Sequence, residues 1–150
     1  MARRSEPPLP EELGVLIKET QTVLHQRMDE ALRPLGLTVP QYVCLQNLHD
    51  SPGITSSELA RRTFVTRQAM NVLLQGLVQR GLVERSDDPG PRRELAATPT
   101  DSASALLRRA HDHVGSIVQR MTADLSHHEL ERLRELLATC RDSLLDQDHR

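Results

Sequence analysis

Four side chains that can hydrogen-bond to base edges recur within a short stretch of the chain, residues 66–79. They are Arg67, Gln68, Asn71 and Gln75. In the major groove of double-stranded DNA, Arg pairs bidentately with guanine, and Asn or Gln pairs bidentately with adenine. Glu and Lys, which usually fill a solvated helix face, do not occur in this stretch. The stretch is therefore a candidate for reading base pairs.

An amphipathic helix is needed to hold these side chains on one face. Apolar residues recur at helical spacing on the opposite face, at Ala69, Met70, Leu73, Leu74, Leu77 and Val78. Thr66 is the expected N-cap, and Gly81 is expected to end the helix as a C′ glycine. The pattern predicts a recognition helix with a buried side and a base-reading side.

A shorter helix should precede it, beginning at the sequence Thr55-Ser56-Ser57-Glu58. This is an S/T-x-x-E capping box, in which hydroxyl and carboxylate satisfy each other's free backbone N–H groups. Leu59 then provides a buried edge. Because only a few residues separate the two helices, they must cross steeply, as in a helix-turn-helix.

A β-ribbon is expected directly after the recognition helix. Residues 82–85 alternate like a short strand, residues 86–91 are turn-forming, and a second strand is expected over residues 94–98. Arg92 and Arg93 lie near the tip, where such a ribbon can reach a DNA groove. The candidate DNA-binding residues are then Ser56, Thr66, Arg67, Gln68, Asn71, Gln75, Arg92 and Arg93.

The segment LARRTFVTRQAMNVLLQGLVQRGLVER, the Arg pair before the returning strand and Thr100 seven residues after Arg93 resemble the winged helix-turn-helix of MarR-type bacterial transcriptional regulators. The resemblance covers roughly residues 11–145. It implies a homodimeric, ligand-relieved repressor on a near-palindromic operator. The chain departs from the family pattern at Thr63-Phe64, which replace a Leu-Gly turn, at Val72, where Arg is common, at Pro91, where Asp is common, and at Ala103, where Gly is common.

Long apolar stripes lie outside the winged segment, on a first helix expected over residues 11–32 and on two helices after Thr100. They are too long for the small winged module to cover, and the resemblance implies a dimerisation core. We therefore expect a mainly α (α+β) fold with a flexible tail at 1–10, a helical dimerisation region at 11–35 and 100–150, and a DNA-binding domain at 36–99.

Two residues are candidates for binding a small-molecule effector. Arg27 lies on the apolar stripe of the first helix, so it forms either a cross-helix ion pair or an anchor for an aromatic or aliphatic carboxylate. Tyr42 lies in a segment that lines a pocket in MarR-like proteins. The alternative for Tyr42 is a place in the core.

The charge distribution favours contact with phosphates. The chain of 150 residues has a net charge of −2, with 27% charged and 37% hydrophobic residues. Residues 55–93 hold seven Arg and four acidic residues, a net charge of +3, and the remainder of the chain carries −5. The positively charged segment 55–93 can approach DNA while the acidic remainder of the chain stays clear of it.

Several other classes of protein find little support. The pair His111 and His113 is separated by about 200° around a helix, and no His pair has the i, i+3 or i, i+4 spacing of metal ligands. Cys44 and Cys140 stand alone, as in a reduced cytoplasmic protein. No catalytic motif, cofactor-binding loop or membrane span is evident. A zinc-sensing regulator of the same fold and a winged-helix protein-interaction module are the alternatives.

Overall fold

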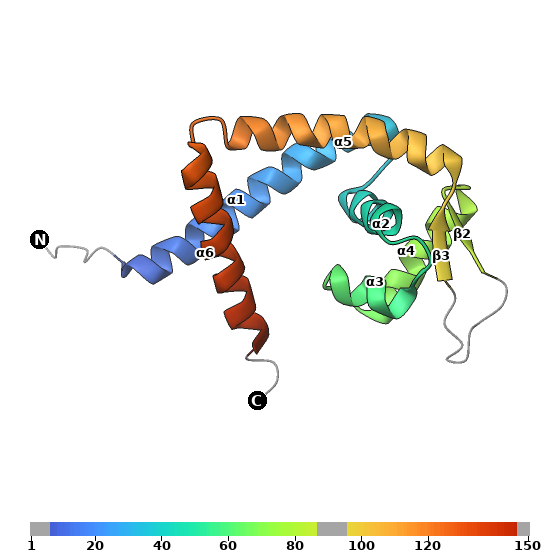
Figure 1. Cartoon of the computed structure of the whole chain (residues 1–150), viewed down its shortest axis with the longest axis horizontal. Helices are drawn as coiled ribbons and strands as arrows, with labels where there is room; N and C mark the ends of the chain where they lie inside the picture. Colours follow the sequence, from blue (N-terminus) through green and yellow to red (C-terminus); the bar gives the residue numbers. More distant parts are fainter. Residues whose placement is uncertain (1–6, 87–95, 147–150) are drawn as a thin grey trace, which may run out of the picture. The chain divides into compact units, whose positions relative to one another are not determined.

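The computed structural model describes residues 7–86 and 96–146, which form helices and one small sheet (Figure 1). The helices and strands confirm a mainly helical winged helix-turn-helix. In chain order they are α1 (Leu9–Leu32), the 3₁₀ turn η1 (Arg33–Leu35), α2 (Val39–Asp50), β1 (Ile54–Thr55), α3 (Ser56–Arg62), α4 (Arg67–Gln79), β2 (Val83–Arg85), β3 (Ala96–Pro99), α5 (Asp101–Met121) and α6 (His127–Leu145).

Three antiparallel strands form the sheet, in the order β1-β3-β2. Val83 lies opposite Pro99 and Arg85 opposite Ala97 in the ribbon, while Ile54 of β1 pairs with the same Ala97 from the other side. The two-residue strand β1 was not predicted, because a pair of residues carries no periodicity. The expected start of the returning strand at Glu94 lies outside the described residues.

The core lies beneath the helix-turn-helix and is built from leucines. Fully buried side chains come from α1 to α4, namely Leu32, Leu45, Leu48, Leu59, Met70, Leu74 and Leu77. Burying one such side chain contributes about 1.5–3 kcal/mol. The buried stripe of α4 is narrower than predicted, because Ala69 is exposed and Val78 is 39% exposed.

Helix starts were predicted well wherever a hydroxyl acts as the N-cap. Thr38 with Gln41 and Ser126 with Glu129 form complete capping boxes on α2 and α6. The Oγ1 of Thr100 accepts from the N–H of Ala103 at 3.2 Å, so Thr100 caps α5. Helix α1 begins at Leu9, two residues earlier than expected, because Pro10 suits a first helical turn.

The chain divides into two compact units, one that extends to Val114 and one that begins at Gly115. In the first unit, the apolar side chains along α1 are 45–66% exposed over residues 9–23. In the second unit, α6 buries none of its residues, and Leu133, Leu136 and Leu137 are 41–46% exposed. Within the described residues, no helix is long and apolar enough to span a bilayer.

Candidate nucleic-acid interface

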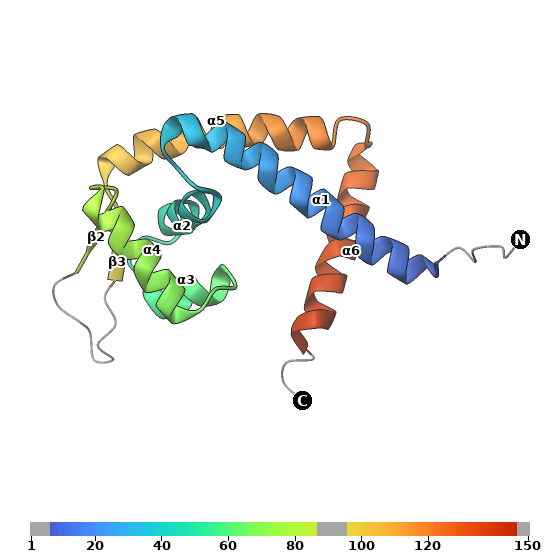
Figure 2. The ribbon, with the colours of Figure 1, turned by 180° about the vertical axis from the view of Figure 1, so that it is seen from behind.

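Helix α4 presents a polar face outward because its opposite face is anchored in the core. Met70, Leu74 and Leu77 are fully buried. Four of the predicted base-reading residues lie on the exposed part of the helix, namely Arg67, Gln68, Asn71 and Gln75. Figure 2 shows α4 in front of α3. The predicted helix is confirmed, and the base-reading role of these four residues stays a prediction.

Both ends of α4 are fixed by local hydrogen bonds. The Oγ1 of Thr66 accepts from the N–H of Ala69 at 3.1 Å, so this hydroxyl caps the helix. At the other end, Gly81 has a φ of 71° and donates to the Val78 carbonyl at 3.0 Å, and Leu82 donates to the Leu77 carbonyl at 2.9 Å. This pair of bonds is a Schellman motif. The recognition helix therefore ends at a defined residue and leads directly into β2.

Arg85 is a residue of the site that sequence reasoning missed. Its Nη2 donates to the Oδ1 of Asn71 at 3.4 Å, which links the strand β2 to the recognition helix. The Nε of Arg85 is buried and has no hydrogen-bond partner among the described atoms. Strand periodicity could have indicated this side chain, because Arg85 stands two residues after the buried Val83 and shares its face of the strand.

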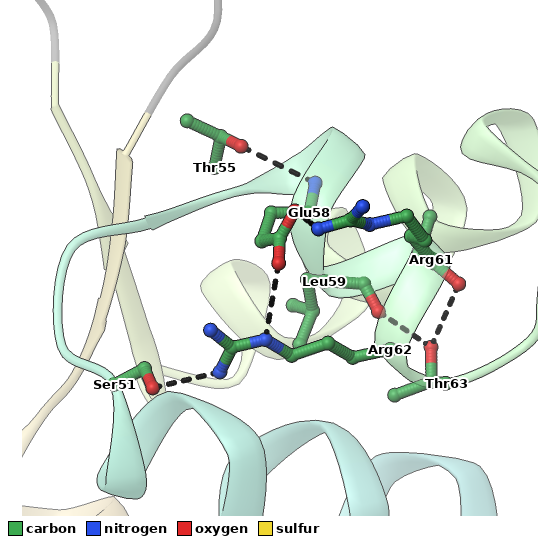
Figure 3. Close-up of polar contacts among 8 residues, drawn as sticks. Ser51, Thr55, Glu58, Leu59, Arg61, Arg62 and Thr63 are labelled. Carbon is green, nitrogen blue, oxygen red and sulfur yellow. Dashed lines mark hydrogen bonds and ion pairs between the residues drawn. The ribbon is translucent and has the colours of Figure 1, made fainter.

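Helix α3 is held by a network of charged hydrogen bonds (Figure 3). The Oγ1 of Thr55 accepts from the Glu58 N–H at 3.2 Å, as the predicted capping box requires. In a full capping box the Glu58 carboxylate would accept from the Thr55 N–H. Here it accepts from the guanidinium groups of Arg61 and Arg62 instead. The hydrogen bond from Arg61 is the main reason that the pKa of Glu58 lies below its usual range. Arg62 also donates to the Oγ of Ser51 at 2.8 Å, which ties α3 to the end of α2.

The turn between α3 and α4 is closed around Phe64. Its φ of 58° lies in the left-handed region that favours glycine, and its side chain is 69% exposed. The hydroxyl of Thr63 donates to the Leu59 carbonyl at 2.8 Å, and the N–H of Val65 donates to the Ala60 carbonyl at 3.1 Å. These bonds hold a non-glycine residue in a conformation that costs about 1–2 kcal/mol.

The remaining predicted DNA contacts lie at helix starts or in the wing. Ser56 is the first residue of α3 and is partly buried. Thr66 is exposed, although its hydroxyl is already engaged as the cap of α4. Arg92 and Arg93 lie outside the described residues.

The two candidate effector residues do not meet at one site. Arg27 pairs with Glu30 on its own helix at 3.2 Å, and both side chains are more than half exposed. Within the described residues this ion pair lies along α1 itself, and the choice between a cross-helix ion pair and a carboxylate anchor for Arg27 stays a prediction. Tyr42 is buried in the core, and its OH lies 3.4 Å from the Nδ1 of His111. Burial raises the pKa of Tyr42.

The thiol of Cys44 is also buried, and this raises its pKa to about 12. Cys44 therefore serves as a small hydrophobic residue.

A surface pocket of about 360 Å³ lies between α2 and the first half of α5. It is lined by Gln46, His49, Asp50, Ser104, Leu107, Arg108, His111 and Asp112. The lining includes one guanidinium, two imidazoles, two carboxylates and the apolar side chain of Leu107. Such a lining offers hydrogen-bond donors and acceptors beside an apolar side chain, as small-molecule sites do.

The chain is similar to known regulators over most of its length. The model of the MarR family matches residues 35–94. An HTH-type transcriptional repressor of Mycobacterium tuberculosis is 41% identical over 130 residues, which are 85% of this chain and 94% of that protein. This identity extends beyond the winged module into the flanking helices.

Solved structures of a MarR family protein from M. tuberculosis have the same fold. In its complex with DNA the TM-score is 0.69 at 36% identity, covering 90% of this chain and 98% of that one. In its complex with salicylic acid the TM-score is 0.67 at 38% identity, covering 91% and 98%. The capped recognition helix, the ribbon that follows it and these matches across both chains have one explanation: the protein belongs to the MarR family.

Proposed function

We propose that this protein is a transcriptional repressor that binds a near-palindromic operator in double-stranded DNA as a homodimer. The observation that carries the proposal is the outward face of α4, where Gln68, Asn71 and Gln75 are exposed while Met70 and Leu74 anchor the opposite face. The complex of the similar M. tuberculosis protein with DNA supports it. Such a repressor acts in the cytoplasm, where a bacterial chromosome lies.

Each α4 enters a major groove in this proposal, with the side chains near its N-terminus against base edges. A two-fold dimer then places its half-sites about one helical turn apart, or 10–10.5 base pairs. Arg92 and Arg93 of the wing contribute contacts to phosphates or to the minor groove, which hold the protein on DNA with little regard to sequence.

The dimer accounts for the apolar surface left open in a single chain. Along α1, Leu13, Leu16 and Ile17 are 45–57% exposed, and α6 exposes Leu133 and Leu136. An exposed apolar stripe on each of these helices marks an association site in a protein of this size. In a two-fold dimer both copies use the same surface, so the exposed helices of one copy can pack against those of the other.

The test begins with a pool of genomic fragments, from which the purified full chain retains its targets. Duplexes made from the retained sequences and random duplexes are then titrated at several salt concentrations. We expect a near-palindromic consensus, binding to it that is at least about 10³-fold tighter than to random DNA, and a linear decrease of log affinity with log salt. Equal and salt-insensitive binding to both duplexes would instead favour a protein-interaction module.

We further propose that a small carboxylate relieves repression by binding in the pocket between α2 and α5. The support is the guanidinium of Arg108 in the pocket lining and the complex of the similar protein with salicylic acid. A ligand lowers operator affinity only if it binds better to the conformation that grips DNA poorly.

Salicylate and single variants test this site. Arg108→Ala should bind operator normally and lose release by salicylate, whereas Arg109→Ala, an exposed neighbour outside the pocket lining, should retain it. Arg27→Ala examines, in the same assay, the hypothesis that Arg27 anchors the carboxylate. Release that is unchanged in Arg108→Ala and abolished in Arg27→Ala would place the site on α1 instead.

A further inference from the structure

Val72 is an apolar side chain on the outward face of the recognition helix. It is 66% exposed, although the other branched or sulfur-containing apolar residues in the middle of α4 face the core. At about 100° per residue, Val72 lies about 40° around the helix from Gln68 and about 60° from Gln75. It therefore lies beside Gln68 and Gln75, on the same face of the helix as these two side chains that we assign to base reading.

The side chain of Val72 has a nearly fixed conformation, which suits packing against one defined apolar group. In a helix, a β-branched side chain is held almost entirely in one χ1 rotamer, so its two methyl groups point in a fixed direction. Valine is also a weaker helix former than the alanine, leucine or glutamine found elsewhere in α4. An exposed valine at this position adds little to the helix itself, and its methyl groups are presented outward.

The groove that α4 is proposed to enter offers only one apolar group on the base edges, the C5-methyl of thymine. The other major-groove atoms are hydrogen-bond donors and acceptors, which glutamine and asparagine can satisfy and valine cannot. Val72 is in the sixth position of α4, one turn after Gln68, within the part of a recognition helix that contacts bases.

We propose that Val72 is a specificity-determining residue that packs against the C5-methyl of one thymine in each operator half-site. This inference rests on the proposed function, because it requires α4 to lie in the major groove. It adds a thymine at a defined place in the half-site, next to the base pair that Gln68 reads.

The experiment replaces thymine by uracil, one position at a time, in the operator selected by the full-length protein. This change removes a single methyl from the major groove and leaves the Watson–Crick pairing intact. At one thymine per half-site we expect a loss of affinity of about fourfold, and of about fifteenfold when both half-sites are changed. The other positions should show little change.

Val72→Ala identifies the residue that senses this methyl. The variant should bind the thymine and uracil operators equally and bind random duplex as the wild type does. Val78→Ala is the matched control, since Val78 is partly exposed near the other end of α4 and should retain the full thymine preference. Circular dichroism verifies that both variants are folded.

The outcomes separate this inference from the proposed function. An operator with no methyl-sensitive thymine, or a Val72→Ala variant that keeps the full thymine preference, overturns the role of Val72 while repression remains intact. A wild-type protein that selects no DNA sequence at all overturns the proposed function itself.

Discussion

The guanidinium of Arg85, on β2, donates a hydrogen bond to the side-chain carbonyl of Asn71, on α4. The two residues are fourteen apart in the chain, and this hydrogen bond joins the first strand of the wing to the helix that we assign to base reading. Because the side-chain oxygen of Asn71 accepts from Arg85, the NH2 group of Asn71 is directed away from Arg85. Arg85 is thus a positioning residue for Asn71.

A double-mutant cycle of Asn71→Ala and Arg85→Ala should show this dependence. We expect each single variant to weaken operator binding and the double variant to weaken it less than the sum, with a coupling energy of about 0.5–1 kcal/mol. Affinities for operator and random duplex give the cycle. The same cycle between Gln68 and Arg85 serves as the comparison and should be additive. Additivity in both cycles would mean that Arg85 does not orient Asn71.

Gln68 should contribute to sequence reading and the wing to general affinity. Gln68→Ala is expected to cost about 1–3 kcal/mol per half-site on the operator and little on random duplex, because alanine cannot hydrogen-bond to a base edge. Replacing Arg92 and Arg93 together should weaken both duplexes and make the salt dependence shallower, by about one unit of slope for each phosphate that the variant no longer neutralises. Titrations at several salt concentrations measure both effects. The opposite pattern would exchange the roles of the two elements.

Phe64→Gly should stabilise the protein. Glycine adopts a positive φ without steric cost, whereas Phe64 holds its φ of 58° against a penalty of about 1–2 kcal/mol. Part of the gain is offset by the greater freedom of glycine in the unfolded chain, so we expect a net increase of about 0.5–1 kcal/mol in the free energy of unfolding. Urea denaturation measures it. Phe64→Ala retains the Cβ and should show no such gain, and a gain equal to that of Gly would attribute the effect to the exposed ring.

Glu58 should stabilise α3 in a manner that depends on pH. Its pKa is lowered in the folded protein, chiefly by the hydrogen bond from Arg61. A lowered pKa means that the stabilisation is present above the ordinary glutamate value of about 4.3 and is lost as pH falls through the folded value. The difference in stability between wild type and Glu58→Gln should therefore shrink as the pH is lowered from 7 towards 3. The exposed Glu84, replaced by Gln, is the control, and a difference that does not change with pH would contradict the expectation.

Glutamate substitutions at two leucines should separate folding from dimerisation. Leu107 is 5% exposed within a single chain, so Leu107→Glu buries a charge and should unfold the protein. Leu136 is 46% exposed, so Leu136→Glu should yield a folded monomer if α6 is part of the dimer interface. Sedimentation at micromolar concentration, with circular dichroism, distinguishes these results. A Leu136→Glu protein that remains a dimer would place the interface elsewhere.

The sequence predicted those features whose cause is local. Thr38, Thr66 and Ser126 cap helices by bonding to N–H groups three residues away, and Gly81 ends α4, so a short stretch contains all the information. Arg85 was missed because its partner depends on how β2 lies against α4. The ion pair of Arg27 with Glu30 was not predicted, because an apolar stripe does not show which side chains its polar members meet within one chain.

The hydroxyl of Thr100 joins the end of α4 to the start of α5, the helix that carries part of the pocket lining. The Oγ1 of Thr100 donates to the Gly81 carbonyl at 2.8 Å while it caps α5, and the Thr100 N–H donates to the Leu82 carbonyl at 3.1 Å. These hydrogen bonds hold the end of α4 and the start of α5 together. Leu107 and Arg108 of the pocket lie on α5, about two turns after Thr100. If the proposed ligand shifts α5, we expect these hydrogen bonds to pass the shift to the end of α4, although the ligand itself does not touch α4.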